Sequence, residues 1–206
     1  MPAPLIVYLH GFRSSPLSVK ARAMVRAVDA LPAAKRPTLV VPELGHSPAA
    51  AIATVLALVG DHRGLASAAF VGSSLGGYYA TWLAERLGAR AALINPAVRP
   101  FDDLAPYRGT QTNMYSGERF EVTDAHFEEL RALAVPRITR PDRYFLLVQS
   151  GDEVLDWREA VSHYAGAWQF VQGGGDHAFQ GFDAQIPAIL RFTSGSDSNL
   201  TPVSHG

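Results

Sequence analysis

A serine lies at the centre of the segment Gly72-Ser73-Ser74-Leu75-Gly76. The segment matches G-x-S-x-G, in which a sharp turn between a strand and a helix lifts the serine hydroxyl clear of a sheet. Glycines are needed on both sides because the turn brings the strand and helix backbones very close together. The pattern predicts Ser74 as the nucleophile of an acyl-transfer reaction and gives Ser73 a structural role.

A glycine-rich loop that binds a phosphate is the alternative interpretation of this segment. A dinucleotide-binding fingerprint requires G-x-G-x-x-G, and Ser74 stands where the second glycine belongs. A P-loop requires a lysine after its glycines, and Gly77 is followed by Tyr78. Because neither pattern fits, the nucleophile is preferred.

Two aspartates, Asp152 and Asp156, compete for the role of a catalytic acid. Both follow a predicted strand at 144–149. Asp156 precedes a predicted helix and has Glu159 three residues further on, which is a helix-capping arrangement. Asp152 lies at the carboxyl end of the strand, where ligand-binding residues of open α/β sheets gather. Asp152 is therefore favoured, with Asp156 second and Glu153 third.

His177 lies in a glycine-rich turn beyond the last predicted strand. The chain order of Ser74, Asp152 and His177 is that of the α/β hydrolases, which predicts His177 as the base that takes the serine proton. The remaining histidines show no metal-ligand spacing and the chain has no cysteine. We expect no metal and no cofactor.

An acyl-transfer site also needs two main-chain amides that bind the developing oxyanion. One amide comes from the residue after the nucleophile and one from the loop after an early strand, which nominates Leu75 and Phe12. Gly11 lets this loop pass close to the nucleophile. His10 is predicted to anchor the loop rather than to catalyse, and Arg13 either contacts an anionic substrate or lies in solvent.

The elements that position these residues alternate along the chain. Strands are predicted at 5–9, 38–42, 68–71, 91–94, 144–149 and 167–171, and helices at 16–31, 48–60, 75–87, 124–134, 157–165 and 183–192. Alternating short apolar strands and helices indicate βαβ units and a parallel sheet covered on both faces. We therefore predict an α/β fold, doubly wound around about six parallel strands, with the candidate residues at their carboxyl ends.

About fifty residues separate the fourth and fifth predicted strands, and a loop that long is rarely structureless in a compact domain. We expect an insertion at about 97–140 that forms a short helical cap over the sheet edge. Its apolar side chains, together with one from the histidine turn, are candidate walls of a substrate pocket: Phe101, Met114, Tyr115 and Phe179.

Composition bounds the class of protein. The chain has 206 residues, of which 48% are hydrophobic and 18% charged, as in a globular domain. We predict one domain at 1–192 and a disordered polar tail at 193–206. A net charge of -1 without blocks of like charge indicates no nucleic-acid partner. No apolar stretch is long enough for a membrane span and no signal-peptide pattern is found, so a cytoplasmic location is expected.

The chain resembles the YqiA-like esterases, a small bacterial branch of the α/β-hydrolase superfamily. The shared blocks are LHGFxSSP at 9–16, SSLGGYYAT at 73–81, NPAVRP at 95–100, GDEVLD at 151–156 and GGDHAF at 174–179. The resemblance extends over about residues 5–192. It implies hydrolysis of short acyl esters or acyl-CoA thioesters, and it carries the family's catalytic triad to Ser74, Asp152 and His177.

The sequence thus predicts a serine esterase that hydrolyses short- to medium-chain acyl esters through an acyl-enzyme. Three alternatives stay open: an acyl-CoA thioesterase, a non-catalytic binding protein, and another α/β-hydrolase reaction such as carbon–carbon bond hydrolysis. The expected partner is a small-molecule ester or thioester, and the oligomeric state is not predicted.

Overall fold

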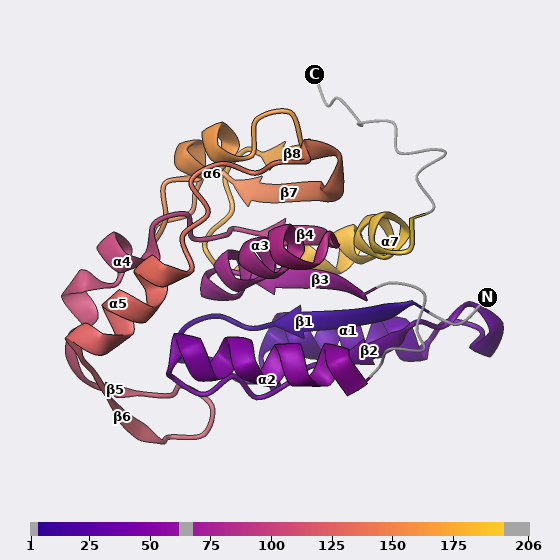
Figure 1. Ribbon diagram of the computed structural model, residues 1–206. Helices are drawn as coiled ribbons and strands as arrows, with labels where there is room; N and C mark the ends of the chain where they lie inside the picture. The colour runs from indigo at the N-terminus through magenta and orange to yellow at the C-terminus, as the bar shows by residue number, and fades with distance from the viewer. Residues whose placement is uncertain (1–3, 62–67, 196–206) are drawn as a thin grey trace.

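A parallel sheet of six strands forms the centre of the computed structural model, which describes residues 4–61 and 68–195. The strands lie in the order β2-β1-β3-β4-β7-β8, and every neighbouring pair is parallel (Figure 1). Their bounds are β1 (Leu5–Leu9), β2 (Thr38–Val40), β3 (Ala68–Ser73), β4 (Arg90–Ile94), β7 (Tyr144–Gln149) and β8 (Trp168–Gln172). The predicted α/β fold is confirmed.

Helices cover both faces of the sheet. In β1, Leu5, Val7 and Leu9 face a core shared with α2 (Pro48–Asp61), α3 (Leu75–Leu87) and α6 (Trp157–His163). The intervening Ile6 and Tyr8 face a second core shared with α1 (Val19–Asp29) and α7 (Phe182–Thr193). All five of these β1 side chains are at most 1% exposed, which explains why the strand is apolar at every position.

Most predicted boundaries lie within two residues of the observed ones, but the first helix does not begin at Pro16. The Ser15 hydroxyl accepts a hydrogen bond from the Leu17 amide at 3.0 Å, and this local turn delays the start of α1 to Val19. The second strand also ends earlier than predicted, at Val40.

The segment between β4 and β7 lies beside the carboxyl ends of the strands (Figure 1). It contains α4 (Pro100–Asp103) and α5 (Asp124–Ala132), and also an antiparallel hairpin of β5 (Gly109–Thr112) and β6 (Arg119–Val122). The insertion therefore contains helices, as predicted, and also a hairpin that the sequence analysis did not predict. Short 3₁₀ turns complete the described elements at Ala33–Lys35, Ala105–Tyr107 and Pro141–Arg143.

The last helix, α7, extends to Thr193, one residue into the predicted tail. Residues 196–206 of that tail lie outside the described residues. The disorder predicted for the tail therefore stays a prediction. Within residues 4–61 and 68–195, no helix combines the length and the apolar character needed to cross a bilayer.

Candidate active site

Ser74 occupies a strained turn between β3 and α3. Its backbone has φ 56° and ψ −124°, a conformation that residues with a side chain rarely adopt. The turn is fixed because the Ser74 amide donates to the Ile94 oxygen at 3.1 Å, and the Ser74 oxygen accepts from the Gly77 amide at 2.9 Å. A side chain at Gly72 would overlap the main chain of Gly76. The glycines of the sequence pattern are thus required by close backbone approach.

The structure brings the three predicted triad residues together from three separate loops. The Nε2 atom of His177 lies 3.1 Å from the Ser74 hydroxyl oxygen. Its Nδ1 atom lies 3.0 and 2.9 Å from the two carboxylate oxygens of Asp152. The Asp152 side chain is 2% exposed and the His177 side chain 23%. A hydrogen-bond chain of this geometry is the one that a serine nucleophile, a histidine base and an orienting acid require.

Local hydrogen bonds hold the Asp152 carboxylate in its ionised form. Burial acts to raise the pKa of Asp152, but hydrogen bonds from His177 and from the Leu155 and Val154 amides outweigh it and lower that pKa. Both amides donate to Oδ1 of Asp152 at 2.9 Å. The negative charge is therefore available beside the His177 ring at neutral pH.

The two competing acids of this segment lie in different places. Asp156 caps α6, where its Oδ1 atom accepts from the Arg158 amide at 2.9 Å. Glu153 does not reach the His177 ring, but its carboxylate accepts a hydrogen bond from the His177 main-chain amide at 3.0 Å. The structure therefore places only Asp152 against the imidazole.

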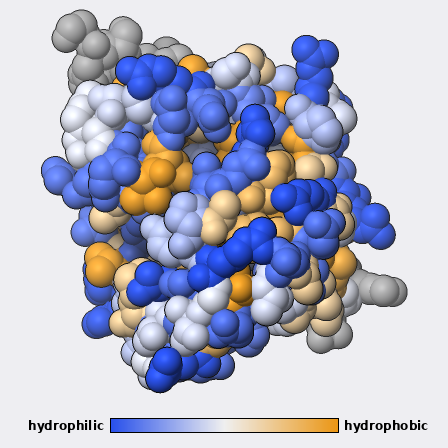
Figure 2. Space-filling model, turned by 90° about the vertical axis from the view of Figure 1, so that its left-hand side faces the viewer, coloured by the Kyte–Doolittle hydropathy of each residue, from blue (hydrophilic) through white to orange (hydrophobic). Residues whose placement is uncertain are grey.

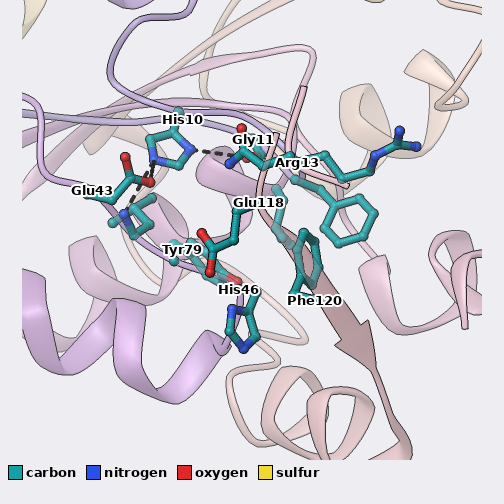
Figure 3. Close-up of a pocket in the computed structure, with 13 residues that line it drawn as sticks. His10, Gly11, Arg13, Glu43, His46, Tyr79, Glu118 and Phe120 are labelled. Carbon is teal, nitrogen blue, oxygen red and sulfur yellow. Dashed lines mark hydrogen bonds and ion pairs between the residues drawn. The ribbon is translucent and has the colours of Figure 1, made fainter. Parts of the chain in front are cut away.

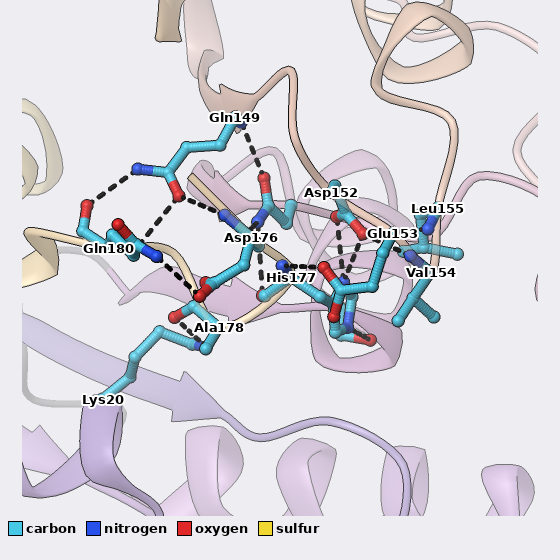
Figure 4. A network of polar contacts seen from close by, with 12 residues as sticks. Lys20, Gln149, Asp152, Glu153, Val154, Leu155, Asp176, His177, Ala178 and Gln180 are labelled. Atoms are coloured by element: carbon cyan, nitrogen blue, oxygen red, sulfur yellow. Dashed lines mark hydrogen bonds and ion pairs between the residues drawn. The ribbon is translucent and has the colours of Figure 1, made fainter. Parts of the chain in front are cut away.

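Two buried amide side chains that the sequence analysis missed hold the histidine loop (Figure 4). Asn95, 2% exposed, donates to the main-chain oxygens of Asp176 and His177 at 3.0 and 3.2 Å. Gln149, fully buried, accepts from the amides of Asp176 and Gln180 at 3.1 and 2.8 Å. Asn95 also accepts from the Gln149 amide at 3.0 Å, which joins the two into one network.

The opposite side of the histidine loop is held by Lys20 from α1, whose ammonium group donates to the Ala178 oxygen at 2.9 Å (Figure 4). Burial lowers the pKa of Lys20, and the negative charges of Asp176 and Asp152 partly offset this effect. Lys20 is a further residue near the site that no sequence pattern nominated.

The two predicted oxyanion donors, Phe12 and Leu75, line the same cavity as Ser74. Leu75 is the first residue of α3, so its amide has no acceptor within the helix. No hydrogen-bond partner of the Phe12 amide lies among the described residues. The loop that carries Phe12 passes directly over the nucleophile, since a Cβ at Gly11 would lie 3.2 Å from the Ser74 Cβ.

A cavity of about 230 Å³ opens onto Ser74 and His177. Its walls are mostly apolar and its charged members are Arg13 and Asp103. Figure 2, which views this side of the molecule, shows apolar side chains gathered within a largely hydrophilic face. The pKa of Asp103 is raised to about 6. Burial is the largest cause, and the nearby negative charges of Glu159 and Asp102 add to it.

One of the four predicted pocket walls lines this cavity, and three do not. Met114 lines it. Phe101 packs instead on the core under α2 and α3, and Tyr115 is 42% exposed. Phe179, 2% exposed, belongs to the core on the opposite face of the sheet.

A second, smaller cavity of about 50 Å³ shares Phe12, Arg13 and Leu75 with the first, and several of its lining residues are labelled in Figure 3. His10, 2% exposed, lines it and anchors the loop as predicted: Nδ1 contacts the Gly11 oxygen at 3.1 Å and Nε2 accepts from the Leu44 amide at 3.4 Å. Burial lowers the pKa of His10, and the hydrogen bond to Gly11 and the nearby Glu43 partly offset this effect. Arg13 also lines this cavity, and its side chain extends away from His10 and Glu43 (Figure 3).

The six-stranded parallel sheet and the helices on its two faces form the α/β-hydrolase fold. The same architecture occurs in a protein of Agrobacterium vitis S4, with a TM-score of 0.73 and 22% identity over 93% of this chain and 88% of that one. It occurs in Est1E of Butyrivibrio proteoclasticus, with a TM-score of 0.68 and 13% identity over 96% and 90%. It also occurs in an esterase domain of a Rhodothermus marinus protein, with a TM-score of 0.67 and 16% identity over 95% and 88%.

The family itself follows from the sequence. The model of the uncharacterised protein family UPF0227 matches residues 5–194. The chain belongs to this family, and its resemblance to the YqiA-like esterases is confirmed.

Proposed function

We propose that the protein is a serine esterase that hydrolyses short- to medium-chain acyl esters. The observation that carries the proposal is the continuous hydrogen-bond chain from the Ser74 hydroxyl through His177 to Asp152. A cavity of about 230 Å³ is below the usual range for a drug-sized ligand, which favours a small acyl or alcohol group.

In the proposed reaction, His177 Nε2 takes the proton of Ser74 while the serine oxygen attacks the ester carbonyl. The amides of Phe12 and Leu75 donate to the oxyanion of the tetrahedral intermediate. His177 then returns the proton to the departing alcohol, which leaves an acyl-serine. A water molecule, deprotonated by the same histidine, releases the carboxylic acid. Asp152 keeps the imidazole oriented and stabilises its charged form.

The insertion at about 97–140 is proposed to shape the substrate pocket within a single domain at 1–192. Tyr107 and Met114 from this insertion line the cavity with the triad residues. Both come from the segment that contains the unpredicted hairpin, so the shape of the pocket depends on cap residues as well as on the loops that follow the strands.

A fluorophosphonate probe tests the proposal, since it labels only an activated serine. We expect labelling of the wild type and none of Ser74→Ala, whose circular dichroism spectrum should be unchanged. A series of p-nitrophenyl esters from acetate to dodecanoate should then show an optimum among the short chains. If the folded wild type is not labelled, the protein is a non-catalytic binding protein instead.

Acyl-CoA thioester hydrolysis is a second candidate, favoured by the guanidinium of Arg13 in the cavity lining. A cation at this position can pair with a phosphate of the leaving group. Butyryl-CoA and p-nitrophenyl butyrate separate the two functions. A thioesterase would prefer the CoA substrate, and Arg13→Gln would abolish that preference.

A further inference from the structure

The hairpin of the cap is hydrogen-bonded to the loop that carries the Phe12 amide. These two segments are about a hundred residues apart in the sequence, and three bonds of 2.9 Å join them. They run from Arg13 Nε to the Thr112 oxygen, from the Met114 amide to the Arg13 oxygen, and from Asn113 Nδ2 to the Ser14 oxygen. The cap is thus fastened to the loop at Arg13 and Ser14.

Aromatic packing adds to this connection. The ring of Phe12 meets the ring of Tyr107 edge-on at a centroid distance of 5.7 Å, and the ring of Phe120 at 5.9 Å. Figure 3 shows Phe120 of the hairpin beside the loop that contains Gly11 and Arg13. The residue that offers the oxyanion amide is therefore held through its side chain by the cap.

The loop has a conformation that needs such support. Arg13 has φ 56°, in the left-handed region that a residue with a side chain seldom occupies. On the sheet side, His10 anchors the start of the loop to the Leu44 amide. The hairpin supplies the anchor on the other side, beyond Arg13.

We propose that Asn113 is a positioning residue, which holds the Phe12 amide in place for the oxyanion by fastening the loop to the cap. The inference rests on the proposed esterase function and deepens it. Oxyanion binding needs donors at hydrogen-bond distance from the oxygen in the transition state, so displacement of the loop lowers kcat rather than ground-state binding.

Asn113 has two separable roles, and Asn113→Asp removes one of them. The Oδ1 atom accepts from the Tyr115 and Ser116 amides at 2.9 and 3.1 Å, which shapes the hairpin turn. The Nδ2 atom makes the bond to Ser14. Aspartate keeps an acceptor for the turn, but its second oxygen would face the Ser14 oxygen without a proton to donate.

Thr110→Val is the matched control. Thr110 lies on the same hairpin, and its hydroxyl donates to the Glu121 carboxylate at 2.9 Å. Its loss removes a hairpin hydrogen bond of the same length without touching the loop. Asn113→Ala is measured as well, because it introduces no carboxylate and remains informative if the aspartate variant does not fold.

With p-nitrophenyl butyrate, we expect Asn113→Asp and Asn113→Ala to lower kcat by on the order of 10- to 100-fold while KM changes less than about twofold. The rate of fluorophosphonate labelling should fall by the same factor, since the phosphoryl oxygen occupies the oxyanion position. Thr110→Val should retain both rates.

Three results would overturn the inference. The first is wild-type kcat in the folded Asn113 variants, and the second is a raised KM with unchanged kcat. The third is an equal loss in Thr110→Val, which would indicate general weakening of the hairpin. A wild type that neither hydrolyses the ester nor is labelled at Ser74 removes the proposed function, and the inference with it.

Discussion

The side-chain amide of Asn95 donates a hydrogen bond to the main-chain oxygen of His177, at 3.2 Å. Asn95 directly follows β4, which lies inside the sheet, whereas His177 follows β8, which lies at the edge of the sheet. A residue at the end of an inner strand therefore holds the loop that carries the candidate base. The φ of Asn95 is 41°, which asparagine tolerates better than most residues. Backbone conformation and side-chain chemistry therefore both favour asparagine here.

Removal of the Asn95 side chain should impair turnover. Asn95→Gly keeps the positive φ without strain, so it isolates the lost hydrogen bonds. We expect kcat to fall, and the free energy of unfolding to fall by about 1–3 kcal/mol because buried partners lose their bonds. Asn95→Ala should be less stable still, since alanine is strained at this φ. Equal kcat in Asn95→Gly and wild type would show that the loop is held without Asn95.

The two aspartates after β7 should separate rate from stability. Asp152→Asn should lower kcat by on the order of 10⁴-fold, because an amide no longer fixes the histidine tautomer. Asp156→Ala should keep kcat and lose about 1 kcal/mol of unfolding free energy, because it removes the cap of α6. Steady-state kinetics and urea denaturation of both variants check this assignment, and the reverse pattern would make Asp156 the acid.

Gly76 and Gly173 form a matched pair that tests whether close approach of two backbones requires a glycine. A side chain at Gly76 would overlap the main-chain oxygen of Leu9, whereas a side chain at Gly173 would meet nothing within 4 Å. Gly76→Ala should cost more than about 3 kcal/mol of unfolding free energy or prevent folding. Gly173→Ala should be neutral or slightly stabilising. A stable, active Gly76→Ala protein would contradict the close approach of β1 and α3.

The charge of Asp103 should make stability depend on pH. Burial and neighbouring acids raise its pKa from 3.8 to about 6, so the folded protein binds its proton more tightly than the unfolded chain. Its contribution to stability therefore declines as the pH rises from about 4 to above 6. Asp103→Asn should be more stable than wild type at pH 8, and the difference should shrink towards pH 4. Urea midpoints at both pH values measure this, and a less stable variant at pH 8 would refute it.

Much of the fold could be predicted because strands buried on both faces are apolar at nearly every position. The hairpin escaped prediction since its strands have four residues each, and the first, Gly109–Thr112, contains no large apolar side chain. Its contacts with the loop around Arg13 are set by tertiary structure, which no local pattern encodes.

The candidate site was predictable where a residue follows a strand in a known pattern, as Ser74 does. Asn95 and Gln149 were missed, although each is a polar residue at the carboxyl end of an apolar strand. That position was itself a usable signal. No local sequence signal was available for Lys20, since it contacts Ala178 of the histidine loop, 158 positions further along the sequence.

The separation of 103 positions between Ser74 and His177 has a consequence for synthesis on the ribosome. A nascent chain that has completed β3 and α3 already contains the proposed nucleophile, but the proposed base has not yet been translated. If Ser74 needs His177 for its reactivity, such a chain cannot attack cellular esters. Hydrolytic activity should appear only when β8 and the turn after it have joined the sheet, so reactivity of Ser74 reports that the domain has finished folding.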